Sequence, residues 1–151
     1  MHALILYASF SGNTEEVAEL IKDSLLNKSI DVTLYRITRQ PVHIPDFTKF
    51  DMIFFGSFTW AKGATPEIVK RFVYQIGYKP ENIFVFGTGD TQFGGDVLFC
   101  KAADKLAKFY TSPLPPLKIE QSPRGEQVAK VIQWTEGVVT FCNKYLKKLP
   151  C

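Results

Sequence analysis

The sequence has few of the features that mark secreted, membrane-spanning or metal-binding proteins. Its three cysteines, Cys100, Cys142 and Cys151, are odd in number and show no CxxC spacing, which fits a reducing cytoplasm better than a disulfide framework. Residues His2–Ala8 are too short for a signal peptide and lack a basic flank, and no apolar run approaches membrane-spanning length. Neither histidine has carboxylate or cysteine partners at metal-ligand spacing. We therefore expect a cytoplasmic protein with no metal site and no membrane contact.

The charge of the chain does not favour a large polyanionic partner such as a nucleic acid. The formal net charge is only +3, and no run of lysine and arginine is interleaved with aromatic residues. We therefore expect no nucleic-acid binding. The 151 residues, 46% of them hydrophobic and 22% charged, predict one globular domain over residues 1–151. Cys100 and Cys142 lie in apolar helical contexts, where we expect core thiols, and the terminal Cys151 has no expected role.

Five apolar runs have the length of strands. Three of them contain continuous apolar runs, which is typical of parallel strands buried on both faces, whereas Ile30–Arg36 alternates as an edge strand does. Pro115 and Pro116 assign the last run to an edge as well. The expected strands are His2–Ala8, Ile30–Arg36, Asp51–Phe58, Asn82–Thr88 and Leu114–Gln121.

Helical patterns lie between these strands. One begins at Asn13, a second begins with Thr65 as its cap and ends at Gly77, a third spans Asp96–Tyr110, and the last spans Gly125–Lys148. We expect Phe109 on the apolar side of the third helix, and Ile132 and Tyr145 on that of the last. Residues 37–50 predict a surface loop with a short helical turn. Strict alternation of strands and helices predicts a parallel sheet with helices on both faces.

Ligands of such sheets bind at the carboxyl ends of strands, so the segments that leave the first, third and fourth strands are the candidates. The first contains Ser9, Phe10, Ser11, Gly12, Asn13 and Thr14. Its hydroxyls and the free amides of a helix start predict an anion site, although an ordinary helix start is an equal alternative. The segment lacks the lysine of a Walker A loop, which suits a phosphate that does not react.

The other two segments supply flat aromatic side chains. Thr59, Trp60, Ala61, Lys62 and Gly63 follow the third strand, and Trp60 in a polar loop is expected to stack on a planar ring rather than to fold onto a helix. The third segment contains Thr88, Gly89, Asp90 and Phe93, with Phe93 as the wall for the opposite face of the ring or, alternatively, as an inward core residue. A phosphate seat and two aromatic walls describe a site for a mononucleotide with a flat ring.

These three segments resemble the cofactor loops of the short-chain flavodoxins. Residues 9–15 resemble the phosphate loop, residues 56–66 match the second loop at Gly56, Thr59, Trp60, Gly63 and Pro66, and the third loop matches through Cys100 and Asp104. The resemblance spans essentially the whole chain in order and spacing. It implies a flavodoxin-like doubly wound five-stranded parallel sheet of order 2-1-3-4-5, an order that the alternation of strands and helices does not by itself fix.

The resemblance also implies a function. The protein would be a monomeric one-electron carrier with non-covalent FMN, bound by the residues named in the three loops, and would have no substrate turnover of its own. Its partners would be a ferredoxin/flavodoxin-NADP-type reductase and redox acceptor proteins, docked transiently. The alternatives are a flavodoxin-like activator of a manganese ribonucleotide reductase and an FMN-dependent NAD(P)H:quinone reductase. A phospho-acceptor receiver domain is excluded, because Tyr7-Ala8-Ser9 and Gly56-Ser57 stand where its carboxylates belong.

Four departures from the family pattern are visible. Ala61 stands at a position where a turn with positive φ forms on one-electron reduction in flavodoxins, which costs about 1 kcal/mol relative to glycine. Lys62 replaces an acid near the ring, which predicts a less negative second potential. Phe93 replaces the usual tyrosine, and Gly94-Gly95 lengthens the loop. The chain is basic, with an isoelectric point of about 8.7, whereas the family is mostly acidic, so we expect a different partner or weaker charge steering.

Overall fold

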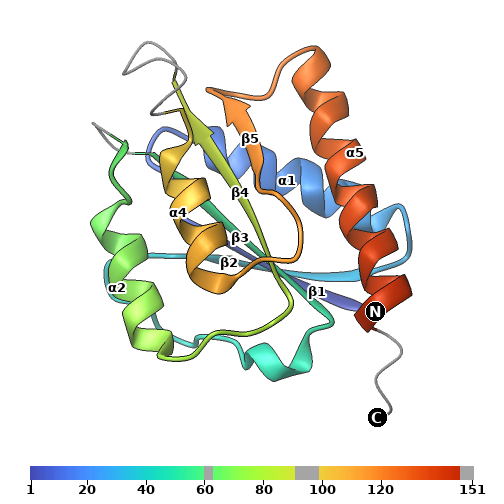
Figure 1. Cartoon of the computed structure of the whole chain (residues 1–151), viewed down its shortest axis with the longest axis horizontal. Coiled ribbons are helices and arrows are strands. Elements are labelled where there is room, and N and C mark those ends of the chain that lie inside the picture. The colour runs from blue at the N-terminus through green and yellow to red at the C-terminus, as the bar shows by residue number, and fades with distance from the viewer. Residues whose placement is uncertain (60–62, 91–98, 147–151) are drawn as a thin grey trace.

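The computed structural model describes residues 1–59, 63–90 and 99–146 (Figure 1). Strands and helices alternate along this part of the chain, with two short helical segments, η1 and η3, of the 3-10 and π types. The elements are β1 (His2–Tyr7), α1 (Asn13–Leu26), β2 (Asp31–Arg36), η1 (Phe47–Lys49), β3 (Met52–Phe58), α2 (Glu67–Ile76), β4 (Ile83–Gly89), α4 (Lys101–Tyr110), β5 (Leu117–Glu120), α5 (Glu126–Phe141) and η3 (Cys142–Leu146).

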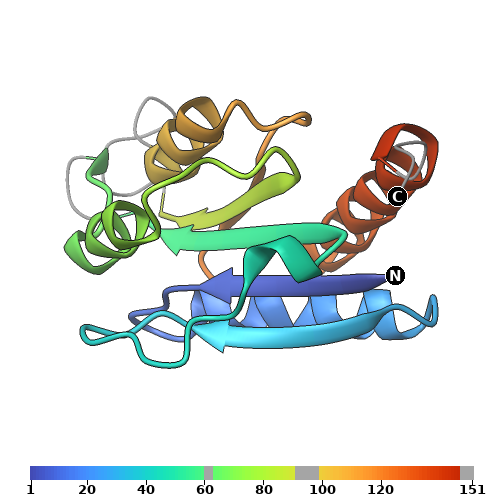
Figure 2. The ribbon, with the colours of Figure 1, turned by 90° about the horizontal axis from the view of Figure 1, so that it is seen from below.

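The five strands form one parallel sheet in the order β2-β1-β3-β4-β5. This confirms the predicted fold, and it confirms that the alternating second run and the proline-preceded fifth run form the two edges. In Figure 1, α2 and α4 lie on one side of the twisted sheet, and α1 and α5 lie on the other. Figure 2 shows the arrowheads of β1 to β4 pointing toward the same end of the molecule, so the loops that leave these strands gather there.

Alternate side chains of β1 enter two separate cores. Ala3 and Ile5 belong to the core shared with α1 and α5, whereas Leu4 and Leu6 belong to the core shared with α2 and α4. All four side chains are fully buried. Because helices cover both faces, the central strand reads as an unbroken apolar run, which was the signal that predicted its place.

The prediction that Cys100 and Cys142 are core thiols is confirmed. Cys100 and Cys142 are buried, and burial raises the pKa of each thiol to about 12. The His2 ring packs edge-on against Phe50, and its Nε2 lies 3.2 Å from the hydroxyl of Thr33. Within the described residues no group of three histidine, cysteine or acidic side chains could hold a metal ion, and no helix is long and apolar enough to cross a membrane.

The start of α2 differs from the prediction. Pro66 occupies the capping position, with ψ of 143°, and makes no side-chain hydrogen bond, so the expected Thr65 cap is wrong. The C-terminal end agrees with the prediction: Gly77 adopts a left-handed conformation with φ of 78°, and its amide donates to the carbonyl of Val73.

The third predicted helix is shorter than expected at its start. α4 begins at Lys101 rather than at Asp96, because Cys100 has φ of 51° and a left-handed residue interrupts a right-handed helix. The segment before Phe99 lies outside the described residues. α5 begins within one residue of the prediction, but its α-helical geometry ends at Phe141 and continues as the π-helical segment η3.

Three aromatic or aliphatic side chains that we expected on buried faces are exposed. Phe109 lies at the surface because α4 packs against the sheet through Leu106 and Tyr110, which turns Phe109 outward. Ile132 on α5 and Tyr145 on η3 are also exposed, so the apolar stripe predicted for the last helix is wider than its buried face. The helices themselves were predicted correctly, but their predicted buried faces included residues that are exposed.

The connections that precede β3 and β5 both contain prolines. β5 begins at Leu117 rather than at Leu114, since Pro115 and Pro116 cannot donate to the ladder. The predicted short helical turn between β2 and β3 is confirmed as η1, which is capped by the Asp46 carboxylate accepting from the Thr48 amide at 3.0 Å. Hydrogen bonds from the Thr48 amide and hydroxyl lower the pKa of Asp46.

Candidate functional site

Three loops meet at the carboxyl end of the central strands. Backbone pairing continues beyond the strands: the Ala8 amide donates to the Gly56 carbonyl at 3.0 Å, and the Thr59 amide donates to the Thr88 carbonyl at 3.1 Å. The chain leaves β1 toward the β2 edge, whereas it leaves β3 toward the β4 and β5 edge. The winding direction therefore reverses between β1 and β3, which is where open parallel sheets bind ligands.

The first loop exposes an uncapped helix start. Gly12 precedes α1 with φ of 92°, a left-handed conformation, and contributes no side-chain cap. A Cβ at Gly12 would meet nothing within 4 Å, so the space beside the loop is open. The amides of Asn13 and Thr14 begin the helix and have no acceptor within it. These donors and the positive end of the helix dipole form a seat for an anion.

The side chains of this loop divide into inward and outward groups. The Ser9 hydroxyl oxygen accepts from the Gly12 amide at 3.0 Å, which closes the loop and leaves the hydroxyl hydrogen to donate elsewhere. Ser11 is exposed at the tip. Phe10 is 73% exposed, and its ring lies 6.0 Å from that of Phe58, beside the start of the second loop.

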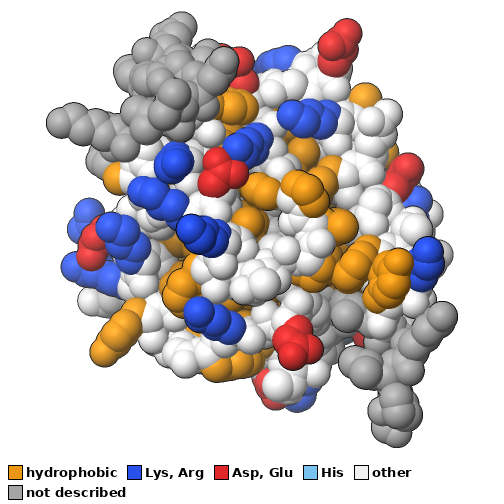
Figure 3. All heavy atoms as spheres, in the orientation of Figure 1, with side chains coloured by type: hydrophobic (Ala, Val, Ile, Leu, Met, Phe, Trp, Pro, Cys, Tyr) orange, Lys and Arg blue, Asp and Glu red, His pale blue; other side chains and the backbone are white. Residues whose placement is uncertain are grey.

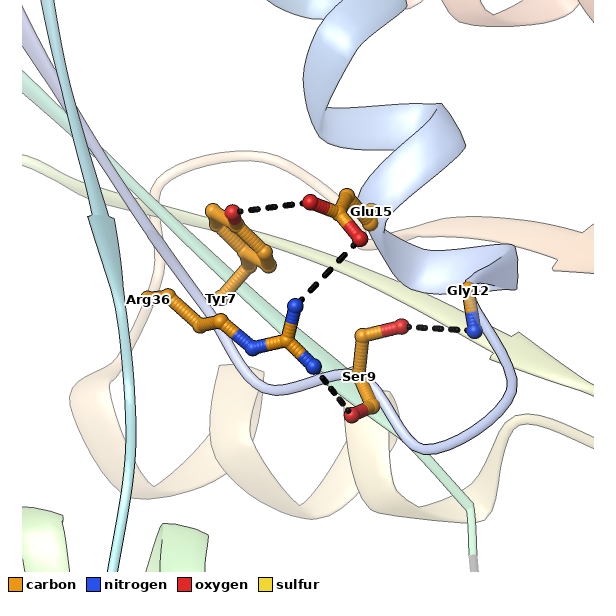
Figure 4. Close-up of polar contacts among 5 residues, drawn as sticks. All are labelled: Tyr7, Ser9, Gly12, Glu15 and Arg36. Atoms are coloured by element: carbon orange, nitrogen blue, oxygen red, sulfur yellow. Dashed lines mark hydrogen bonds and ion pairs between the residues drawn. The ribbon is translucent and has the colours of Figure 1, made fainter.

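A polar network beneath the loop holds it against α1 and β2 (Figure 4). Arg36, at the end of β2, donates to the Ser9 carbonyl and to the Glu15 carboxylate, each at 3.4 Å. The Tyr7 hydroxyl donates to the other carboxylate oxygen of Glu15 at 3.3 Å. The network thus joins the end of β2, the end of β1 and the first turn of α1. Sequence reasoning missed it, because nothing in the local pattern places Arg36 beside Ser9.

The charges of this network are largely neutralised. The Arg36–Glu15 pair is about half exposed on both sides, so it contributes little to stability, and its main effect is to fix the loop. Burial and, secondarily, the Glu15 carboxylate raise the pKa of Tyr7, which keeps its phenol protonated as a donor. Apart from the paired Arg36, the loop contributes no cation, so its anion-binding capacity comes from dipoles and hydroxyls.

Two predicted cofactor residues bind each other. The hydroxyls of Thr14 and Thr88 lie 2.8 Å apart, and both side chains are buried. This bond joins α1 to β4 directly behind the first loop. The structure therefore brings these two loops together as predicted, through side chains that face the interior.

The second loop is attached to α4. The Thr59 hydroxyl accepts from the Ala102 amide at 3.3 Å, and the Gly63 carbonyl accepts from the Lys105 ammonium at 3.0 Å. Gly63 has φ of 76°, which a side chain would strain. The predicted ring-binding residues between them, Trp60, Ala61 and Lys62, lie outside the described residues.

The third loop leaves β4 under tight packing. A Cβ on Gly87 would lie 2.7 Å from the Cβ of Ala103, and one on Gly89 would lie 2.9 Å from the Cys100 amide nitrogen. At these two glycines, β4 therefore approaches α4 and the residue before it closely. The Asp90 carboxylate accepts from the Gln121 side chain at 3.0 Å, which orients it along β5. Phe93, the second expected wall, lies outside the described residues.

Fold and site together define a doubly wound α/β protein with an open helix start, rich in uncharged hydrogen-bond donors, where the winding direction of its sheet reverses. The comparisons narrow this class to one family. The flavodoxin family model matches residues 5–112, and the chain belongs to the flavodoxin family. Flavodoxins are flavin-binding electron carriers and do not turn over a substrate, and this chain is such a carrier.

Individual relatives extend the match over nearly the whole chain. A probable flavodoxin 2 of Bacillus subtilis is 32% identical and aligns with 98% of this chain and 96% of its own length. The structure of oxidised flavodoxin 2 from Bacillus cereus has a TM-score of 0.79 at 31% identity, covering 93% of this chain and 99% of that one. A short-chain flavodoxin associated with a bacterial microcompartment has a TM-score of 0.82 at 28% identity, covering 94% and 99%.

Proposed function

We propose that the flavin of this carrier is FMN, with its phosphate in the loop Ser9–Thr14. The observation that carries the proposal is the start of α1, which Gly12 precedes without a side-chain cap, where amides, hydroxyls and a helix dipole converge and the neighbouring Arg36 is paired with Glu15. Such a site suits an anion that is held and never transferred. Ser9, Ser11, Gly12, Asn13 and Thr14 would hold the phosphate.

Further residues at the carboxyl ends of β3 and β4 would hold the rest of FMN. Thr59 and Asp90 lie at the ends of neighbouring strands, where they would contact the ribityl chain or the edge of the ring. Trp60 and Phe93 would stack on the ring faces. When bound, the flavin supplies the one-electron chemistry, and the protein orients it and excludes water from it.

We further propose the cellular setting that the family resemblance implied. The chain would act as a single cytoplasmic domain and a monomer. It would receive electrons from a ferredoxin/flavodoxin-NADP-type reductase and pass them to acceptor proteins. The named carriers among its relatives support the carrier role, and these partners are the finer part of the proposal.

Cofactor identity can be tested directly on the purified protein. We expect a yellow protein that releases one equivalent of FMN, and no FAD, on denaturation. The apoprotein should regain its colour with added FMN. Release of FAD, or an apoprotein that takes up neither flavin, would contradict the proposal. Steady-state oxidation of NADPH by the isolated protein with a quinone would instead favour a reductase.

A further inference from the structure

A basic, aromatic groove lies between α2 and α4, away from the phosphate seat. It has a volume of about 580 Å³. Three aromatic side chains line it, Tyr74, Tyr78 and Phe109, with exposed fractions of 89%, 49% and 42%. Aromatic side chains are enriched where proteins dock, and these three are gathered in one place rather than scattered over the surface.

Three lysines surround these rings. Lys70, Lys79 and Lys105 line the groove, and no acidic side chain does so among its described lining residues. Figure 3 shows lysine and arginine side chains gathered over α2 and α4, with hydrophobic side chains between them. The Lys79 ammonium lies 4.1 Å from the centre of the Phe109 ring, so charge and aromatic surface are combined at the same spot.

The positive charge of the groove is not compensated by nearby acids. On the same two helices, Glu67 pairs with Arg71, and Asp104 pairs with Lys118. Within the described part of the chain, none of the ion pairs involves a lysine of the groove. The small net charge of the whole protein thus conceals a local cationic surface, which attracts an acidic partner by long-range steering.

The groove is connected to the second cofactor loop. Thr65, which follows that loop, lines the groove, and the Lys105 ammonium donates to the carbonyl of Gly63 within the loop at 3.0 Å. A protein seated in the groove would therefore lie beside the loop that carries Trp60. This position suits a partner that exchanges electrons with the cofactor.

We infer that the α2–α4 groove docks an electron-transfer partner whose surface presents carboxylates around an apolar side chain. The inference rests on the proposed function and specifies the partner's chemistry. The aromatic side chains of the groove take the apolar contact, and the lysines take the carboxylates. Charge complementarity selects an acidic protein over a second copy of this chain, because a second copy would present the same basic face.

The test uses the flavin-loaded protein, reduced beforehand with light and EDTA, and two ferric cytochromes c of opposite charge. One electron leaves the reduced protein and converts ferric to ferrous haem, which stopped-flow absorbance follows. We expect the rate constant with the acidic cytochrome to fall about tenfold when salt is raised from 10 to ~200 mM, because salt screens charge steering. The basic cytochrome should not show this loss.

Charge reversal locates the effect. Lys70→Glu/Lys79→Glu should lower the rate constant for the acidic cytochrome about tenfold at low salt. Lys28→Glu/Lys144→Glu makes the same change of net charge on exposed residues beside α1 and α5, on the other face of the sheet, and should lower it less than about twofold. Equal losses in both variants, or none in the first, would overturn the inference.

The apolar part of the surface has its own variant and readout. Tyr74→Ser should weaken the docking further, whereas Val42→Ser, at another exposed apolar residue, should not. Amide shifts of the labelled protein on addition of the acidic cytochrome should cluster on α2 and α4. Shifts confined to other elements would contradict the inference. Failure to bind flavin at all would contradict the proposed function, with transfer absent for both cytochromes.

Discussion

The proposed phosphate loop and the α2–α4 groove both suit negative charge, but they do so with different chemical groups. The loop, residues 9–14, offers backbone amides, hydroxyls and a helix dipole, and the neighbouring cation Arg36 is paired with Glu15. The groove offers exposed ammonium groups beside aromatic rings. Fixed dipoles suit a ligand that stays bound, whereas exposed charges on long side chains suit an encounter that forms and dissolves.

The difference also shows in how each surface is held. The loop is fixed by hydrogen bonds to α1 and β2, and Gly12 can adopt its left-handed conformation without strain. The groove is held by the packing of α4 against the sheet, with its own side chains projecting outward. Variants should therefore separate the two surfaces by their effects on stability, flavin affinity and salt dependence.

The largest effect is expected at Gly12. Gly12→Ala should lower the free energy of unfolding of the apoprotein by about 1–2 kcal/mol, because alanine is strained at φ of 92° although its Cβ has room. Gly137→Ala, in the exposed middle of α5, should raise it by about 0.5–1 kcal/mol. Urea denaturation of both variants measures this. The same sign in both would contradict the conformational argument.

The substitution Ala61→Gly should change the reduction potential of the bound flavin. Removing the strain of about 1 kcal/mol on the one-electron-reduced form should raise the first one-electron potential by about 40 mV. Ala61 lies outside the described residues, and the expectation comes from the sequence resemblance. Spectroelectrochemical titration measures the shift, with Ala64→Gly as a control that should leave the potential in place. Identical potentials for wild type and Ala61→Gly would rule this expectation out.

Tyr110, at the end of α4, carries a buried hydroxyl group. The Tyr110 hydroxyl is buried and finds no hydrogen-bond partner among the described residues, and burial raises its pKa to about 12. Tyr110→Phe should leave the free energy of unfolding unchanged or raise it by up to about 1 kcal/mol, since an unsatisfied polar group is removed. Thermal and urea unfolding check this. A loss of more than about 1 kcal/mol would mean that the hydroxyl has a partner.

The smallest effect is the one that best separates the two surfaces. Lys70→Glu/Lys79→Glu should change the Kd for FMN by less than about twofold, because both lysines are exposed and neither contacts the phosphate loop. Flavin fluorescence titration measures this Kd. A tenfold weakening would mean that groove and phosphate seat act as one electrostatic site.

The sequence predicted those features that depend on local pattern. The buried runs at β1, β3 and β4 identified central parallel strands, and the carboxyl-end rule identified loops that the structure brings together at one edge of the sheet. It could not predict contacts between distant segments, such as Arg36 with Ser9 or Thr14 with Thr88. These depend on which strand ends lie side by side, and periodicity does not contain that information.

The wrong prediction for Phe109 bears on function, because this residue lines the α2–α4 groove. We expected Phe109 to be buried because it fits an apolar spacing, but α4 packs through Leu106 and Tyr110, which leaves Phe109 at the surface. Periodic spacing shows which residues share one face of a helix, but it does not show which part of that face packs against the sheet. The groove arises from the uncovered part of that face, so it was not visible in the sequence.

The most direct test of the central claim compares FMN with riboflavin, which lacks only the phosphate. Fluorescence titration of the apoprotein should give a Kd for riboflavin at least about 100-fold higher than that for FMN, because the loop Ser9–Thr14 contributes several hydrogen bonds to a charged group. The ratio should largely persist in high salt, since direct hydrogen bonds from backbone amides and hydroxyls supply most of it and salt screens them less than it screens exposed charges. Equal affinities for the two flavins would contradict the assignment of this loop as the phosphate seat.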